Sequence, residues 1–473
     1  MSDGAATDVT RVIAEFAVRP RTDGGPTLSS VQRVLIDTTA VAMAGMTEPS
    51  LTALLAWAQH EHGQGSATVW GTSVTLPASA AALVNGSAAH VLDWDDASPT
   101  LPMHPGAVLL PALVAVSAEQ QVTPARFAAA FNVGAAVFRA VSEALPLSVH
   151  YGRGWHNTST TGRLAATSAL AHLQGLTASQ TAHALGMAVS LASGTRANFG
   201  SATKALHAGF AAKDAVMVVD LVQRGIDANS AALTARGGFF DLFGATTAAL
   251  CADVGQRLTH WEHEWVNDWA IKVYPSCFAT HHAIDAALAL RPYLVVDEVI
   301  GIEVTVHPQG LAPLLARTPR NGLEAKFSMA HNLARALIDG SVTLRDFEDD
   351  RSSDPAVAAL AQRVTCREEP STAGEGTPAP YAQLTIRLRD GSLVQHRVDV
   401  SKGDARQPLS AAEHLDKVTE ACGVMGWSPQ RARALVTAVE AQMSGSAPLR
   451  LQQVLAFAAP TAIIEHEAVR LAE

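Results

Sequence analysis

The sequence predicts a mainly α-helical protein with a smaller α+β part. Alanine-rich segments with helical spacing fill residues 27–268, period-two alternation appears only after residue 272, and helical character returns from residue 410. The economical architecture is a large all-helical domain built from both chain ends, residues 1–272 and 407–473, with an inserted α+β lid domain at residues 273–406. The length of 473 residues and the 48% apolar content are ample for a large buried core.

The first strong helix is predicted over Leu28–Gly45. Its apolar residues fall on one face at spacings of three and four, and Gly45 is placed to stop the helix. Six further segments repeat this pattern: Ala78–Ala89, Pro105–Ala118, Pro124–Ala144, Arg163–Leu173, Ala178–Ser193 and Ala205–Arg224. Many of them are apolar nearly all round, which predicts that they are buried against other helices.

The α+β part is predicted from a strand at Ile302–His307 and a hairpin in which Tyr381–Leu388 and Val394–Val400 flank the turn Asp390-Gly391. A helix is expected between them over Ala325–Ile338. The Pro/Gly/Ser/Thr-rich stretch Pro370–Pro380 predicts a mobile loop. Helices are expected again from Ser410 to Glu473.

Charge and composition exclude several classes of function. Charged residues make up 16% of the chain and the net charge is −10, so neither nucleic acid nor an anionic membrane is an expected partner. The four cysteines are scattered without a Cys-x-x-Cys pair, which argues against zinc and iron–sulfur sites. The N-terminus lacks a signal-peptide pattern, and Pro105–Ala118 is too short to span a bilayer, so we expect a cytoplasmic protein.

Lys204 is the most informative single residue. Lysine is rare in this chain, yet Lys204 lies in an apolar segment rich in glycine and alanine, three residues before His207. A buried ammonium is costly unless it is paired, and its pKa shifts readily, so Lys204 is a candidate acid, base or carboxylate anchor. The structural alternative is a lysine that extends from a helix end to solvent.

A second cluster lies between two predicted buried helices, from His90 to His104, and contains Asp93, Asp95 and Asp96. Loops of this kind are where a rigid scaffold presents functional groups. Helix capping by the aspartates is the structural alternative. The oxygen count alone would permit magnesium or calcium, but the acidic groups are too bunched for a convincing ligand shell, so we expect no metal.

A third cluster contains Tyr151, Arg153 and His156 directly before the predicted Arg163 helix. Arg153 is able to hold a carboxylate with two hydrogen bonds, and the helix N-terminus adds backbone donors. A fourth segment runs from Lys272 to the pair His281-His282 at the predicted domain boundary. Adjacent helical residues point in different directions, so at most one of these histidines is expected to face a cleft.

Together these residue types indicate proton chemistry on a polycarboxylate without a cofactor. Such chemistry needs a base, cations that stabilise an enediolate, and an acid for the departing group or new carbanion. A terpene-type cyclase, suggested by the aspartates in a helical domain, conflicts with an aromatic content of only 5%. A non-catalytic carboxylate-binding protein stays open.

Six segments, in order, resemble the MmgE/PrpD family over essentially the whole chain from about residue 10. They are Asp93–Pro105, Gly154–Gly162, Lys204–Gly209, Tyr274–Asp285, Ala325–Ser328 and Lys402–Ser410. The resemblance implies a helical domain with an α+β lid, usually as a homodimer, and cofactor-independent chemistry on small polycarboxylates.

By position, the resemblance implies active-site roles for Asp93, His104, His156, Lys204 and His281. Our leading hypothesis is a lyase, of dehydratase or decarboxylase type. Lys204 or His156 would take the proton, and His104 would act as acid while Asp93 orients an imidazole. The carboxylates would be bound by Arg153, Lys272, His281 and His331. The runner-up is an epimerase in which Tyr151 and Lys204 exchange protons on opposite faces of one carbon.

Overall fold

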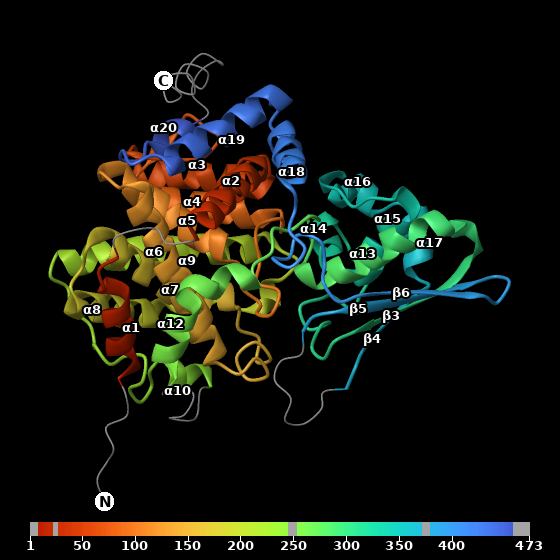
Figure 1. Ribbon diagram of the computed structural model, residues 1–473, viewed down its shortest axis with the longest axis horizontal. Coiled ribbons are helices and arrows are strands. Elements are labelled where there is room, and N and C mark those ends of the chain that lie inside the picture. Colours follow the sequence, from red (N-terminus) through yellow and green to blue (C-terminus); the bar gives the residue numbers. More distant parts are fainter. Residues whose placement is uncertain (1–7, 22–26, 245–252, 371–378, 457–473) are drawn as a thin grey trace, which may run out of the picture.

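The computed structural model describes residues 8–21, 27–244, 253–370 and 379–456. It confirms a mainly helical fold with a small mixed sheet in the C-terminal half (Figure 1). No helix among the described residues combines the length and the apolar character needed to cross a bilayer.

The larger body contains helices from both parts of the chain. From the N-terminal side come α1 (Val9–Val18), α2 (Leu28–Gly45), α3 (Pro49–His62), α4 (Ala78–Val91), α5 (Pro105–Val116), α6 (Pro124–Glu143), α7 (Asn157–Gln174), α8 (Ala178–Leu191), α9 (Ala202–Gln223), α10 (Phe239–Phe243) and α12 (Val254–Glu264). The short strands β1 (Ala67–Thr68) and β2 (Thr75–Leu76) pair between α3 and α4. From the C-terminal side come α18 (Ala411–Val424), α19 (Pro429–Ser444) and α20 (Leu451–Leu455).

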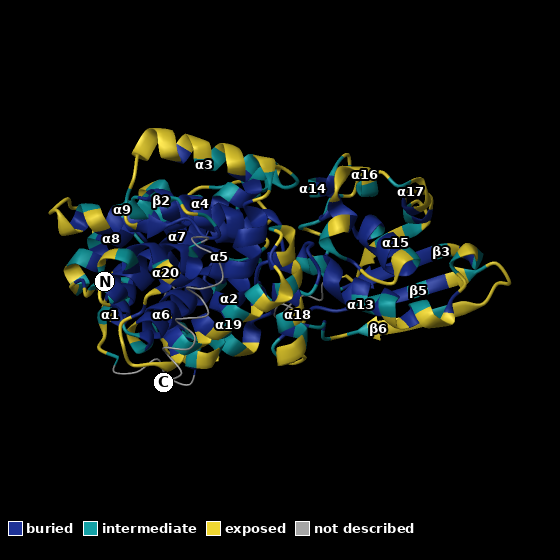
Figure 2. Ribbon diagram, turned by 90° about the horizontal axis from the view of Figure 1, so that it is seen from above, coloured by how far each residue is buried: buried dark blue, intermediate teal, exposed yellow. Residues whose placement is uncertain are grey.

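One hydrophobic core joins these two sets of helices. It runs from Val9 to Trp269 and resumes from Val418 to Leu455, and α18 and α19 lie against α2 (Figures 1 and 2). Every residue of α5 is buried, as its all-round apolar sequence predicts. The expected helices are present, although α7 begins at Asn157, six residues before the predicted start. The domain boundaries at residues 272 and 407 stay a prediction.

Helices α4 and α9 approach each other closely through two glycines. A Cβ on Gly86 would lie 2.9 Å from Gly209 Cα, and one on Gly209 would lie 2.3 Å from the Leu83 carbonyl oxygen. Only glycine permits this separation. The contact holds the first turn of α9, which carries Lys204, beside the C-terminal end of α4 and the loop that follows it.

The smaller body packs helices on a four-stranded sheet with the order β4-β3-β5-β6. Strand β3 (Val299–Val306) pairs in parallel with β4 (Val364–Glu368) and antiparallel with β5 (Ala382–Leu388), which pairs with β6 (Leu393–Val398) as the predicted hairpin. Its helices are α13 (His281–Leu290), α14 (Gly322–Ala325), α15 (Met329–Asp339), α16 (Asp349–Ser352) and α17 (Pro355–Ala361), and its core is separate from that of the helical body.

One prediction for the smaller body needs correction, and two other predictions fall partly outside the described residues. The single helix expected over Ala325–Ile338 is two helices, because the chain leaves α14 at Lys326 and Ser328 caps α15 by accepting a hydrogen bond from the His331 amide. Residues 371–378 of the predicted loop and residues 457–473 of the predicted C-terminal helices lie outside the described residues.

The chain passes from the helical body to the smaller body near Ile271 and returns near Gly403, and backbone hydrogen bonds join these two connecting segments. Ala270 exchanges backbone hydrogen bonds with Ala97, at 3.0 and 2.9 Å, on the loop after α4. On its other side, the Ile271 amide donates to Gly403 and the Ala405 amide donates to Trp269, at 3.0 and 2.8 Å. The segment that carries Lys272 is therefore fixed between the α4–α5 loop and the second connecting segment.

Candidate active site

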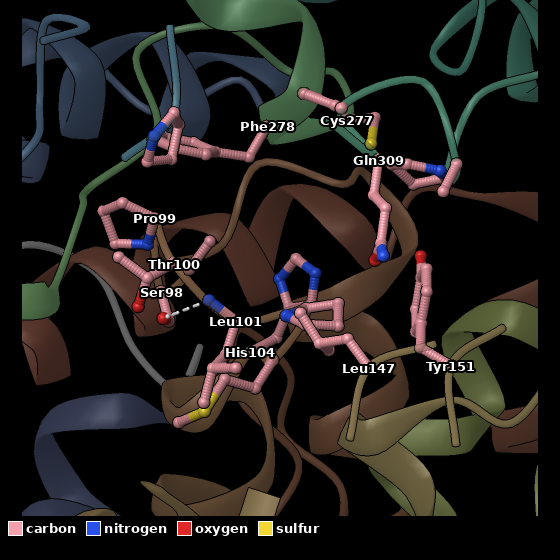
Figure 3. Close-up of a pocket in the computed structure, with 18 of the residues that line it drawn as sticks. Ser98, Pro99, Thr100, Leu101, His104, Leu147, Tyr151, Cys277, Phe278 and Gln309 are labelled. Carbon is pink, nitrogen blue, oxygen red and sulfur yellow. Dashed lines mark hydrogen bonds between the residues drawn. The ribbon is translucent and has the colours of Figure 1, made fainter. Parts of the chain in front are cut away.

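A cavity of about 390 Å³ lies where the two bodies meet. The helical body lines it with residues 93–104, residues 146–156 and the segment around Lys204, and the smaller body adds residues 277–282, 307–313, Phe327 and Pro380. The expected residues Asp93, His104, Tyr151, His156 and Lys204 all line it. Figure 3 shows Tyr151 and Gln309 along one side of this space and Pro99, Leu101 and Phe278 along the other.

Asp93 is the electrostatic centre of the polar wall. Its Oδ1 accepts hydrogen bonds from Lys204 Nζ at 2.9 Å and from Lys272 Nζ at 2.7 Å, and its carbonyl oxygen accepts a second one from Lys272 at 2.9 Å. Burial would raise the pKa of the Asp93 carboxyl, but the two ammonium groups outweigh burial and hold the pKa well below its ordinary value. Asp93 has a positive φ of 52°, which is uncommon outside glycine.

Asp95 orients two imidazoles. Its Oδ2 lies 2.8 Å from His90 Nδ1 and 3.1 Å from His104 Nδ1, and the Asp96 carbonyl oxygen also lies 3.1 Å from His104 Nδ1. Because both neighbours of His104 Nδ1 are acceptors, Nδ1 carries the proton in the neutral ring and Nε2 carries the lone pair. Burial lowers the pKa of His104, and Asp95 only partly offsets that effect, so the ring is neutral near pH 7.

Asp96 differs from its two acidic neighbours. Burial and then the charge of Asp95 raise the pKa of the Asp96 carboxyl well above its ordinary value, so it is protonated where Asp93 is ionised. Its Oδ2 accepts a hydrogen bond from the Gly106 amide at 3.0 Å. A Cβ at Gly106 would lie 2.1 Å from Asp96 Oδ1, so only glycine fits this position at the start of α5.

His156 and Tyr151 are neutral groups in the same cavity. His156 Nδ1 lies 3.0 Å from His207 Nδ1, and burial lowers the pKa of both rings, that of His207 to about 4. Burial also raises the pKa of the Tyr151 phenol, which keeps its proton, and the Arg196 guanidinium lies 3.8 Å from the centre of its ring. The site therefore holds a neutral base and a neutral acid together.

Four expected residues lie outside the cavity lining. Arg153 is exposed, and Lys272 is fully buried behind Asp93. His281 is fully buried with its Nε2 3.4 Å from the Ser276 carbonyl oxygen, and His331 lies against Phe347 in the smaller body. Lys272 therefore acts on Asp93, and the structure gives Arg153, His281 and His331 no place in the cavity wall.

Some contacts and lining residues of the cavity differ from the sequence-based predictions or were not predicted. The carboxylate that contacts imidazoles is Asp95, whereas Asp93 contacts the lysines. His282 lines the cavity in place of His281, in line with the expectation that only one of the pair faces a cleft. Gln309 also lines it, with a positive φ of 66° that no sequence pattern signals. Lys326, buried behind the site, donates to the Leu92 and Pro275 carbonyls at 2.9 Å each.

One group among the described residues has the composition of a metal site. Ligand atoms of His90, Asp93, Asp95 and His104 all lie within 4.8 Å of one another. The Lys272 ammonium lies 2.7 Å from Asp93 and 3.9 Å from Asp95, inside this group. A divalent cation would have to displace or repel that ammonium, so the donor set fits the lysine better than a metal.

Comparison with known proteins agrees with this geometry. The MmgE/PrpD N-terminal domain matches residues 11–249 and the MmgE/PrpD C-terminal domain matches residues 274–441. A cis-aconitate decarboxylase of Mus musculus is 29% identical over 402 residues, which cover 82% of this chain and 80% of that protein. A cis-aconitate decarboxylase of Aspergillus terreus is 26% identical over 446 residues, 89% of this chain and 90% of that protein.

A more partial similarity links the chain to a different activity. A 2-methylcitrate dehydratase of Cupriavidus necator is 28% identical over 131 residues, 26% of this chain and 27% of that protein. The relatives thus include both a decarboxylase and a dehydratase. Since the two domain matches together account for most of the sequence, the chain belongs to the MmgE/PrpD family.

Proposed function

We propose that the protein is a cofactor-independent lyase, of dehydratase or decarboxylase type, that acts on a small di- or tricarboxylate. The observation that carries this proposal is the pairing of His104 with Asp95 beside the Lys204 ammonium in one cavity. A neutral imidazole with its lone pair free is a base for a proton next to a carboxylate, and an adjacent ammonium stabilises the charge that develops on that carboxylate.

In a dehydration, His104 Nε2 takes the proton from the carbon next to the carboxylate, and the electron pair of the broken C–H bond forms the alkene. The hydroxyl group leaves from the neighbouring carbon with a proton from Tyr151, as water. In a decarboxylation, the C–C bond to a carboxylate breaks, carbon dioxide departs, and the electron pair left behind takes a proton from His104 Nε2, which must first take up that proton from solvent to form an imidazolium beside Asp95. At neutral pH, the raised pKa of Tyr151 keeps its proton in place and the lowered pKa of His104 keeps its lone pair free, and both shifts support the roles in the dehydration.

The test is proton NMR in deuterated water with citrate, 2-methylcitrate, cis-aconitate, tartrate and iminodisuccinate. We expect alkene signals or loss of carbon dioxide from at least one acid, and loss of both in His104→Asn. Lys204→Ala should lose turnover and retain measurable binding of the same acid. A wild-type protein that binds these acids and converts none would identify a binding protein instead.

An epimerase is the second candidate, favoured by the presence of both Tyr151 and Lys204 in the cavity wall. The same NMR experiment separates it from a lyase. An epimerase incorporates deuterium at the substrate carbon without forming an alkene or releasing carbon dioxide.

Independence from metals, a cytoplasmic location and a homodimeric state belong to the proposal as well. The Lys272 ammonium inside the only donor cluster found among the described residues supports the first of these. Turnover should be unchanged after dialysis against EDTA, and loss of turnover that Mg²⁺ or Zn²⁺ restores would contradict it. Light scattering at micromolar concentration should give twice the mass of 49.4 kDa.

A further inference from the structure

One wall of the cavity is apolar to a degree that a compact polycarboxylate does not require. Pro99, Leu101 and Phe278 line it, and Leu101 is buried, while the apolar residues Met103 and Leu147 line other parts of the same cavity. Figure 3 shows Pro99, Leu101 and Phe278 across the space from Tyr151 and Gln309. Ser98 and Thr100 lie on the same side, but their hydroxyl groups already bond Asp268 and Arg139. A carboxylate pressed against Pro99, Leu101 and Phe278 would therefore lose hydration and gain no free partner, at a large cost in free energy.

The size of the cavity also exceeds what a compact acid needs. Its volume is about 390 Å³. That volume falls within the range of roughly 300 to 1,000 Å³ typical of sites that enclose ligands of drug size. A substrate that fills the space must therefore extend from the polar wall to the apolar one.

The charge of the site limits the number of carboxylates. Among the described residues that line the cavity, Lys204 is the only lysine or arginine, and it already shares the Asp93 carboxylate with Lys272. Asp93 and Asp95 face the ammonium groups of Lys204 and Lys272, and burial lowers the pKa of Lys326 behind the site to about 7, so the site carries little net positive charge. Within the described lining, Lys204 is the one ammonium that a substrate carboxylate can reach, so every further carboxylate meets uncharged donors.

The remaining polar groups do not add charge. Burial lowers the pKa of the His282 imidazole to about 4 and lowers that of His307, so both rings are neutral near pH 7. Tyr151 and Gln309 offer uncharged donors on the polar side (Figure 3). Neutral donors of this kind hydrogen-bond a carboxylate without neutralising it, so each additional carboxylate adds a cost of desolvation.

We infer that the substrate is a dicarboxylate with an apolar substituent, an alkyl or aryl group that lies against Leu101 and Phe278 while the carboxylates lie at Lys204 and Tyr151. The inference rests on the proposed function and narrows its substrate class. It assigns the choice of substrate to the apolar wall, whereas the proton chemistry belongs to His104.

The test is calorimetric binding of a ligand series to the full chain: succinate, methylsuccinate, butylsuccinate, hexylsuccinate and the tricarboxylate tricarballylate. Affinity should rise about three- to fourfold for each methylene that becomes buried, and hexylsuccinate should bind more tightly than tricarballylate. Affinity that is flat along the alkyl series, or tightest binding by tricarballylate, would overturn the inference.

Variants assign the effect to the wall. Phe278→Ala should reduce the gain per methylene, and Phe278→Trp should weaken hexylsuccinate more than methylsuccinate because it shortens the space. Tyr293→Ala is the matched control, because Tyr293 is an aromatic residue of the same body that is 81% exposed and does not line the cavity, and it should keep the wild-type series. If Phe278→Ala keeps the full gradient, the apolar wall does not bind the substituent.

The two experiments test the substrate class and the lyase activity separately. The alkyl series measures the substrate class, whereas alkene formation or loss of carbon dioxide, followed by NMR, measures the reaction. A steep alkyl gradient with no conversion of substituted hydroxy acids or unsaturated acids would uphold this inference and refute the lyase. Conversion of citrate or cis-aconitate with a flat alkyl series would do the reverse.

Discussion

Replacement of Asp95 by asparagine tests the assignment of His104 as the base. Asparagine has nearly the same shape as aspartate, so the backbone of the α4–α5 loop should be kept. The change removes the negative charge that lies 3.1 Å from His104 Nδ1. That charge stabilises the imidazolium formed when His104 takes a proton from the substrate.

The expected effect follows from the distance. Two unit charges 3.1 Å apart attract by about 5 kcal/mol at an effective dielectric constant of about 20, which is an upper bound here. The imidazolium charge is spread over two nitrogens and asparagine keeps a neutral hydrogen bond, so about 2–4 kcal/mol should be lost from the transition state. We therefore expect kcat to fall by about 30-fold to 1,000-fold.

The pH dependence of the rate should also change. Burial lowers the pKa of His104 and Asp95 raises it, so removing the carboxylate lowers that pKa further. The base form is needed for turnover, so activity falls on the acid side, and Asp95→Asn should move this acid limb to lower pH while it reduces kcat. Initial rates measured from pH 5 to 8 with a substrate that the NMR screen identifies would record both effects.

His90→Asn is the matched control. His90 Nδ1 contacts the same Asp95 oxygen at 2.8 Å, but His90 does not line the large cavity, so its replacement should cost less than about tenfold in kcat. A kcat for Asp95→Asn within threefold of wild type, or an acid limb that moves to higher pH, would refute the reasoning. Circular dichroism would verify that both variants are folded.

Three further predictions concern stability. Lys272→Met should lower the free energy of unfolding in urea by about 2–4 kcal/mol, because Asp93 would stay buried with one ammonium partner in place of two. Gly106→Ala should lower the free energy of unfolding by about 1–3 kcal/mol in the same assay, because the added Cβ would meet Asp96 Oδ1. Gly423→Ala is the control: a Cβ at this helical position would have no atom within 4 Å, so the change should stabilise the protein by up to about 1 kcal/mol. Asp96→Asn should raise the melting temperature at pH 8 more than at pH 4, because the raised pKa of Asp96 makes the wild type lose stability as pH rises through that pKa.

Each of these predictions has a contrary outcome. Unchanged stability of Lys272→Met would mean that Lys204 alone satisfies Asp93. Equal effects of alanine at Gly106 and Gly423 would contradict the close contact at the start of α5. A shift for Asp96→Asn that is the same at both pH values would contradict a protonated carboxyl in the wild type.

Much of the fold was predictable because local sequence patterns mark most of the helices. The bounds of α2 match the prediction, and α4, α5, α6 and α8 each begin at the predicted residue. Strand β4 was missed because it is only five residues long and mostly exposed, and its alternation extends over Val364 to Arg367 alone, so its pairing with β3 depends on tertiary contacts. Helix α7 begins early because buried threonines and serines, weak helix formers alone, are held by packing.

Part of the candidate site could be predicted from the sequence. Asp93, His104, Tyr151, His156 and Lys204 line one cavity, as the prediction required, whereas their catalytic roles stay a prediction. The order of contacts was not readable, because which of several adjacent aspartates meets a lysine or an imidazole depends on backbone turns such as the positive φ at Asp93. Which of the neighbouring histidines His281 and His282 lines the cavity was not predictable either, because it depends on how α13 is rotated relative to the cavity.

The division of the cavity wall between the two bodies has a consequence for divergence within the family. Asp95, His104 and Lys204 all come from the helical body, whereas Phe278 and Gln309 come from the smaller one. Mutations at Phe278 and Gln309 in the smaller body can therefore change part of the substrate contacts without altering the residues proposed to move protons, whereas Pro99 and Leu101 share the α4–α5 loop with Asp95 and His104. One fold is in this way able to give rise to enzymes that share a reaction step and differ in substrate.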